Sequence, residues 1–379
     1  MQTLYAIKQA QGANYLLALD NIADAFLPDL NSMEKQDSNL LESNKQLALA
    51  YFEGYYRKTQ TDDQTPPSIK KIAISAQQEC LAANIFDQKA MFRRMMAEPN
   101  VIYNHYLKIL LMLTELADES FLADDRRMYD EVSEKLEPIH YPTATFAQNR
   151  LILALKENDL LKTELIRREI NWDADRGMLR SFFRETVVKD PTFENYCKAP
   201  NHTAEEDRKM VWYLFNSLIL KTPLTDSYFD DRDFLWTENE DIVKGIIKRT
   251  VKSHEENNFG LQELSPTWED DQYYFEDLFR YVIENESRLE ELVAANLQNW
   301  DIERVAMTDQ VLLKMALAEM LNFPSIPVKV SINEYIDLAK EYSTPKSGQF
   351  LNGILDVLSI KLLQEGKIRK SGRGLIDNK

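Results

Sequence analysis

The chain has 379 residues, of which 44% are hydrophobic, 10 are glycine and 13 are proline. So few turn-forming residues argue against a fold of many short strands, and the abundance of Leu, Ala, Glu, Lys, Gln and Met favours helix, so we predict an all-α fold. The formal net charge of −17 does not attract nucleic-acid phosphates overall, so an RNA contact requires locally gathered basic charge.

The first two thirds of the chain show helical spacing of apolar residues, three or four positions apart. The most apolar segment is predicted to form a central helix, and a capping box, Thr203 with Glu206, opens another. These predicted helices cover residues 15–29, 45–56, 101–116, 145–164, 177–188, 203–219 and 241–255. The stretches 257–260 and 265–266 provide a linker, so we divide the chain into 1–260, 261–366 and a basic flexible tail, 367–379.

After the linker, the helical pattern becomes stronger. A long helix is predicted over 273–297, followed by one that Thr308 caps and whose first turn contains Asp309. The next helix starts either at a capping box of Ser331 and Glu334 or at Pro327. Thr344 and Pro345 open the last helix, whose buried stripe comprises Phe350, Leu351, Ile354, Leu355 and Leu358.

Gly353 stands inside this last predicted helix, where glycine costs roughly 1 kcal/mol relative to alanine. That cost indicates either close packing against a neighbouring helix or the close approach of a partner. The glycine alone does not distinguish the two.

Charge is unevenly distributed along the chain. From Asn296 onward 11 basic residues face 10 acidic ones, whereas the first 295 residues carry about −18. The N-terminal part therefore suits contact with protein rather than with nucleic acid, although an acidic surface that only aids solubility gives the same count.

Enzyme chemistry is not indicated. His105, His140, His202 and His254 are widely spaced and show no metal-ligating pattern, and no nucleotide-binding or nucleophile motif is present. No apolar run suffices to cross a bilayer, no signal peptide is visible, and Cys80 and Cys197 form no CxxC pair. We expect a cytoplasmic protein with two buried reduced thiols, no cofactor and no catalytic site.

Several segments carry a family resemblance. The stretch Ile326–Asp356 includes Ile-Pro at 326–327, Ile-Asn-Glu at 332–334, Leu-Ala-Lys at 338–340 and Phe-Leu-Asn-Gly-Ile-Leu-Asp at 350–356. It resembles the closing two helices of the NusB transcription-antitermination family, and residues 312–321 are similar to that family's preceding helix. Met1–Ala6 resembles the family's first helix, so a long helical insertion would separate the two parts, as in enlarged NusB-like proteins of Bacteroidetes-type bacteria.

The family's first helix normally contains an arginine-rich run just before Gln-x-Leu-Tyr. Here Gln2-Thr3-Leu4-Tyr5 follows Met1 directly. We expect that the start was placed too late. The other reading is a protein that lacks this RNA contact.

The resemblance implies binding of a short single-stranded RNA, boxA, together with a small-subunit ribosomal protein (NusE), in support of RNA polymerase on ribosomal RNA operons. It assigns RNA contacts to Lys346, Gln349, Phe350 and Asn352. On periodicity alone Phe350 is a core aromatic, and Asn352 suits a hydrogen bond to the preceding helix. The basic tail at 367–373 is either a phosphate tether or a disordered end.

For the ribosomal partner, the resemblance assigns Tyr5 and Asp309. A core tyrosine and an acid that complements the helix dipole are the structural alternatives. The second functional hypothesis is a protein-binding helical scaffold of the transcription machinery that does not bind RNA.

Overall fold

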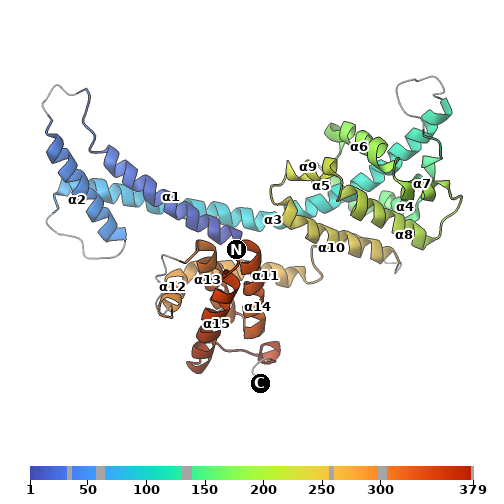
Figure 1. Ribbon diagram of the computed structural model, residues 1–379. Helices are drawn as coiled ribbons and strands as arrows, with labels where there is room; N and C mark the ends of the chain where they lie inside the picture. The colour runs from blue at the N-terminus through green and yellow to red at the C-terminus, as the bar shows by residue number, and fades with distance from the viewer. Residues whose placement is uncertain (32–35, 57–64, 130–138, 256–259, 297–304, 377–379) are drawn as a thin grey trace. The chain divides into compact units, whose positions relative to one another are not determined.

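The computed structural model describes residues 1–376 apart from 32–35, 57–64, 130–138, 256–259 and 297–304 (Figure 1). The described residues form helices and turns without a strand, so the all-α prediction is confirmed. They group into two compact units. Unit 1 comprises Met1–Met96 and Gln272–Lys379, and unit 2 comprises Ala97–Asp271.

This grouping differs from the division that the linker suggested, because the first 96 residues associate with the C-terminal helices rather than with the middle of the chain. Helix α3 contributes to both units. It runs through 63 residues, so the predicted central helix at 101–116 is only part of it.

Unit 1 contains α1 and α2, the first half of α3, and five C-terminal helices. Their bounds are α1 Gln2–Asp24, α2 Ser38–Tyr56, α3 Pro67–Tyr129, α11 Trp268–Glu284, α12 Glu286–Ala294, α13 Met307–Asn322, α14 Val328–Tyr342 and α15 Ser347–Gln364. Leu4 and Ile7 of α1 lie in the same core as α11–α15, so the two ends of the sequence share one core. Helix α13 is central, because eleven of its residues are buried.

A second core in unit 1 joins α1, α2 and the start of α3. Small side chains such as Ala18, Ala48 and Ala73 are almost fully buried there and allow the helices to approach closely. Tyr15 packs against Phe52, with ring centroids 5.6 Å apart. Cys80 also lies in this core, and both cysteines are buried free thiols, as the sequence predicts.

Unit 2 is built on the second half of α3, which contributes Tyr106, Leu107, Leu110 and Leu113 to a large core. The predicted capping box is present, since Thr203 and Glu206 bond reciprocally at the start of α8. Around α3 lie η1 Thr143–Gln148, α4 Arg150–Glu157, α5 Asp159–Arg167, η2 Asp173–Asp175, α6 Arg176–Phe182, η3 Phe183–Val187, α7 Pro191–Lys198, α8 Ala204–Tyr213, η4 Leu214–Ile219, α9 Pro223–Asp230 and α10 Trp236–Glu255.

The described part of the tail after α15, residues 367–376, packs against the rest of unit 1. Ile368 is buried, and the Ser371 amide donates to the Pro324 carbonyl at 2.9 Å. Gly374 packs so closely on Pro324 that a Cβ atom there would lie 2.1 Å from the carbonyl oxygen. Composition alone indicated a solvated basic tail because it does not reveal such backbone packing.

Candidate nucleic-acid interface

The connection between α14 and α15 is fixed by a buried carboxylate. Asp309, in the first turn of α13, is 5% exposed and accepts hydrogen bonds from Ser343 Oγ at 2.7 Å and from Ser347 Oγ at 2.8 Å. Hydrogen bonds to an ionised carboxylate are among the stronger ones in proteins. One acid on α13 therefore sets where α14 ends and where α15 begins.

The helix starts predicted here are partly corrected. Helix α15 begins at Ser347, with Lys346 as its N-cap residue, and the Thr344 hydroxyl contacts the Ser347 hydroxyl at 2.8 Å instead of capping the helix. Helix α13 begins at Met307, so Thr308 lies inside it rather than capping it. For α14 the proline alternative is supported, since Pro327 is its N-cap residue.

Packing on α14 sets the rotation of α15 about its axis. A Cβ atom on Gly348 would lie 3.4 Å from Lys340 Cγ and 3.5 Å from Ile336 Cγ2, so this position has room for a methyl group and little more. The fully buried stripe of α15 comprises Leu351, Leu355, Leu358 and Leu362. The opposite face of α15 is consequently turned to solvent.

The four residues assigned to RNA lie together in the first two turns of α15. Lys346, Gln349 and Asn352 are exposed, and Phe350 is half-buried against the core of unit 1. The N-cap position makes no side-chain hydrogen bond, and a helix N-terminus attracts anions. This end of the helix combines a cation, two amides and a partly accessible aromatic ring.

Gly353 lies on the exposed face, and a Cβ atom there would meet nothing within 4 Å. Packing against a neighbouring helix, one of the two explanations for this glycine, is thereby wrong. The same face continues with Asp356, Val357 and Ile360, the last two each 57% exposed. This face therefore has one cation at each end, Lys346 and Lys361, with the acidic Asp356 between them.

The two residues assigned to a protein partner are placed differently. Tyr5 is 36% exposed, and its hydroxyl accepts a hydrogen bond from Gln9 Nε2 at 3.0 Å. The same Gln9 nitrogen lies 3.3 Å from Met307 Sδ, so Tyr5 sits beside the first residue of α13. The Asp309 side chain, two residues further on, faces inward.

Helices α1, α12 and α13 are joined by ion pairs that sequence reasoning did not identify. Glu286 Oε1 lies 2.5 Å from Lys8 Nζ and 3.3 Å from Lys314 Nζ, and Lys314 is 3% exposed. Burial tends to raise the pKa of Glu286, but the two lysines outweigh it and hold that pKa below its ordinary value. A lysine among the apolar residues of α13 was the available signal for a buried acid.

Glu319, another buried acid of α13, holds α11 and α14 to the central helix. It accepts hydrogen bonds from Ser331 Oγ at 2.6 Å, from Tyr335 Oη at 3.2 Å and from Tyr274 Oη. Ser331 therefore serves this buried network rather than the capping box that its spacing suggested.

Within the described part of the chain, no group of three or more His, Cys, Asp and Glu side chains is placed to hold a metal ion. Among the same residues, no helix combines the length and the apolar character that spanning a membrane requires.

Comparison with known proteins finds relatives of the C-terminal part of the chain. Residues 238–359 match the NusB family. The transcription antitermination protein NusB of Salinibacter ruber is 43% identical over 103 residues, which cover 27% of this chain and 64% of the relative. The NusB of Chloroherpeton thalassium is 46% identical over 96 residues, which cover 25% of this chain and 46% of the relative. The NusB of Bacillus licheniformis is 34% identical over 119 residues, covering 31% of this chain and 91% of that protein.

Proposed function

Because this chain belongs to the NusB family, we propose that it acts in transcription antitermination by binding a boxA-like single-stranded RNA together with a small-subunit ribosomal protein (NusE). The observation that carries the proposal is the start of α15, where Lys346, Gln349 and Asn352 are exposed around the half-buried Phe350. The complex would work in the cytoplasm with the transcription elongation complex, without catalysing a reaction and without a cofactor.

The chemistry of this helix end suits a single strand. Proteins hold single-stranded RNA by charge and by stacking splayed bases on aromatic rings. Phe350 packs partly against the core, which already restricts its side-chain rotamers. A base that stacks on the exposed part of the ring therefore costs little additional side-chain entropy. Gln349 and Asn352 offer amide donors and acceptors to base edges, and Lys346 beside the helix N-terminus suits a phosphate.

For the ribosomal protein, we propose the surface formed by α1 and the first turn of α13. Tyr5 would contact the partner directly, because its ring is partly exposed. Asp309 would act indirectly, because its buried carboxylate accepts hydrogen bonds from Ser343 and Ser347 and so positions the backbone beside the surface.

The proposal is tested by fluorescence anisotropy with a labelled boxA-like RNA and a scrambled RNA of equal length, each with and without the ribosomal protein. We expect tighter binding of the boxA-like RNA, strengthened by the ribosomal protein. Phe350→Ala should weaken this binding about tenfold, in line with the loss of one stacked base. Val357→Ala, on the same exposed face but beyond the proposed contacts, is the matched control and should bind normally. Equal affinity for both RNAs would contradict the proposal.

A second candidate function is a protein-binding scaffold that does not bind RNA. It is favoured by the charge of unit 2, whose residues 97–271 include 35 acidic and 22 basic side chains, and by the exposed Asp356 near the proposed RNA contacts. In the same assay this function predicts capture of the ribosomal protein with no measurable affinity for either RNA.

A further inference from the structure

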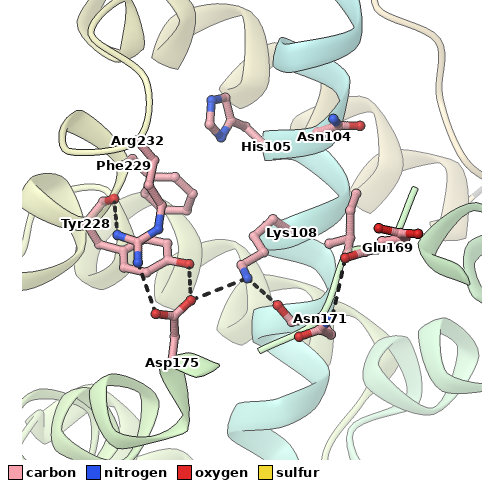
Figure 2. Close-up of a pocket in the computed structure, with 10 residues that line it drawn as sticks. Asn104, His105, Lys108, Glu169, Asn171, Asp175, Tyr228, Phe229 and Arg232 are labelled. Carbon is pink, nitrogen blue, oxygen red and sulfur yellow. Dashed lines mark hydrogen bonds and ion pairs between the residues drawn. The ribbon is translucent and has the colours of Figure 1, made fainter. Parts of the chain in front are cut away.

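A cavity of about 270 Å³ opens in unit 2, outside the residues that match the NusB family (Figure 2). Its walls come from α3, from the segment that links α5 to η2, and from the end of α9. Two cations extend into it, Lys108 from α3 and Arg232 from the turn after α9. The rest of unit 2 is strongly acidic, so paired cations in a cavity call for an explanation.

Asp175 is the carboxylate that these cations share, and it is largely occupied. Its Oδ1 lies 3.0 Å from Arg232 Nη2, and its Oδ2 accepts the Tyr228 hydroxyl at 2.7 Å. Lys108 Nζ is 3.8 Å from the same Oδ2, an ion-pair distance that is too long for a hydrogen bond. Lys108 instead donates to the Asn171 carbonyl, which carries no formal charge.

Aromatic rings hold both cations in place. Lys108 Nζ lies 4.0 Å from the centre of the Trp172 ring, and the Arg232 guanidinium carbon lies 3.8 Å from the centre of the Tyr228 ring. Such contacts attract a cation but provide no hydrogen-bond acceptor. Glu169, the other acid of the wall, directs its carboxylate away from the Lys108 ammonium (Figure 2). Two fixed cations therefore face one carboxylate.

We propose that this cavity binds a small oxyanion, a phosphate group either free or at the end of a small molecule, with Lys108 as its main ligand. The ligand supplies the negative charge that the cluster lacks and accepts the hydrogen bonds that Asp175 does not. The cavity has room for roughly nine water molecules at about 30 Å³ each, which fits a phosphate with a small attached group.

The protonation behaviour of Lys108 agrees with this geometry. Burial lowers its pKa, Arg232 lowers it further, and the carboxylates of Asp175 and Asp173 compensate only in part. A bound phosphate would favour the charged ammonium and raise the pKa of Lys108, so the free amine would react faster with acylating reagents than the occupied one.

The test is calorimetric titration of the full chain with inorganic phosphate, with sulfate as a second tetrahedral anion. We expect saturable binding of phosphate, and Lys108→Met should weaken it about tenfold or more, because methionine keeps the apolar stem over Trp172 but removes the charge. The matched control is Arg176→Gln, which removes an exposed cation paired with Asp173 at 2.9 Å beside the cavity. This control should bind phosphate as the unchanged protein does.

A second measurement does not depend on how the variants fold. In the unchanged protein, phosphate should slow the acylation of Lys108, which peptide mass spectrometry follows. The acylation of Lys156, which is paired with Asp118 at 2.5 Å, should be unaltered. Absence of saturable binding up to about 10 mM phosphate overturns the proposal. So does equal binding by Lys108→Met, or a loss of RNA affinity in that variant without any binding of phosphate.

Discussion

The role of Asp309 is determined by partners that are distant in the sequence. Asp309 has the spacing of an acid that complements a helix dipole, and the family resemblance assigns it to an interface. The structure places it inside, with partners 34 and 38 residues further along the chain. No local pattern reveals such a pairing, because helical periodicity describes only neighbours on one helix.

We expect Asp309→Ala to lower the free energy of unfolding by about 2 kcal/mol, since it removes the shared acceptor of two buried hydroxyls. Urea denaturation followed by circular dichroism measures the change. Asp337→Ala, which breaks an exposed ion pair with Lys340 at 2.7 Å, is the matched control and should change stability by less than about 0.5 kcal/mol. Equal effects of the two substitutions would show that the Asp309 cluster does not fix this turn.

Gly353 allows stability and binding to be separated at a single position. Because a Cβ atom there meets nothing, Gly353→Ala should raise the free energy of unfolding by about 0.5–1 kcal/mol through helix propensity. If the open position serves the close approach of RNA, the same variant should bind boxA-like RNA more weakly in anisotropy titrations. A stabilised variant with unchanged RNA affinity would assign Gly353 no part in binding.

At the scale of helices, the apolar stripes of the C-terminal bundle were predictable. Leu351, Leu355 and Leu358 are buried as their spacing indicates, whereas Phe350 and Ile354 at the edge of the stripe are half-buried. The predicted helix at 273–297 is instead α11 and α12, which meet at Asn285. Residue 297, the last of that prediction, lies outside the described residues. The sequence does not show which helices pack together, because charge pairs such as Lys8 with Glu286 join residues 278 positions apart.

The pairing of α1, α12 and α13 predicts a pH dependence. The pKa of Glu286 is lowered in the folded protein, so its stabilising contribution is complete above the ordinary carboxyl pKa and is lost as pH falls through the lowered value. Glu286→Gln should therefore cost about 2 kcal/mol near pH 7, where it leaves the buried Lys314 without its nearer acid. The difference from the unchanged protein should shrink below about pH 4.5.

Urea denaturation at a series of pH values measures this difference. Glu290→Gln is the matched control, since Glu290 is more exposed and lies 3.7 Å from the same lysine. It should have a smaller effect at every pH. A difference for Glu286→Gln that stays constant down to about pH 3 would show that the ion pairs do not carry the stability.

For the whole molecule, the two ends of the sequence form one unit because α1 adds Leu4 and Ile7 to the core of α11–α15. The resemblance of the first six residues to a family helix anticipated this association. The predicted boundary at residue 260 differs from this grouping because it relied on a loop between 257 and 266, and a loop does not show which helices pack together.

Net charge predicts how salt affects RNA binding. The chain carries −17 overall, and Lys346 is the sole cation of the segment 346–353 that holds the proposed contacts. Each neutralised phosphate of a single strand contributes about −0.7 to the slope of log affinity against log salt concentration, so we expect a slope near −1. Anisotropy titrations at several salt concentrations measure this slope.

The variant is Lys346→Gln, and the control is Lys361→Gln in the last turn of the same helix. Lys346→Gln should flatten the slope by about 0.7, and the control should leave the slope unchanged. A slope steeper than about −3 would mean that several other cations carry the contact and that stacking at Phe350 is not its main source.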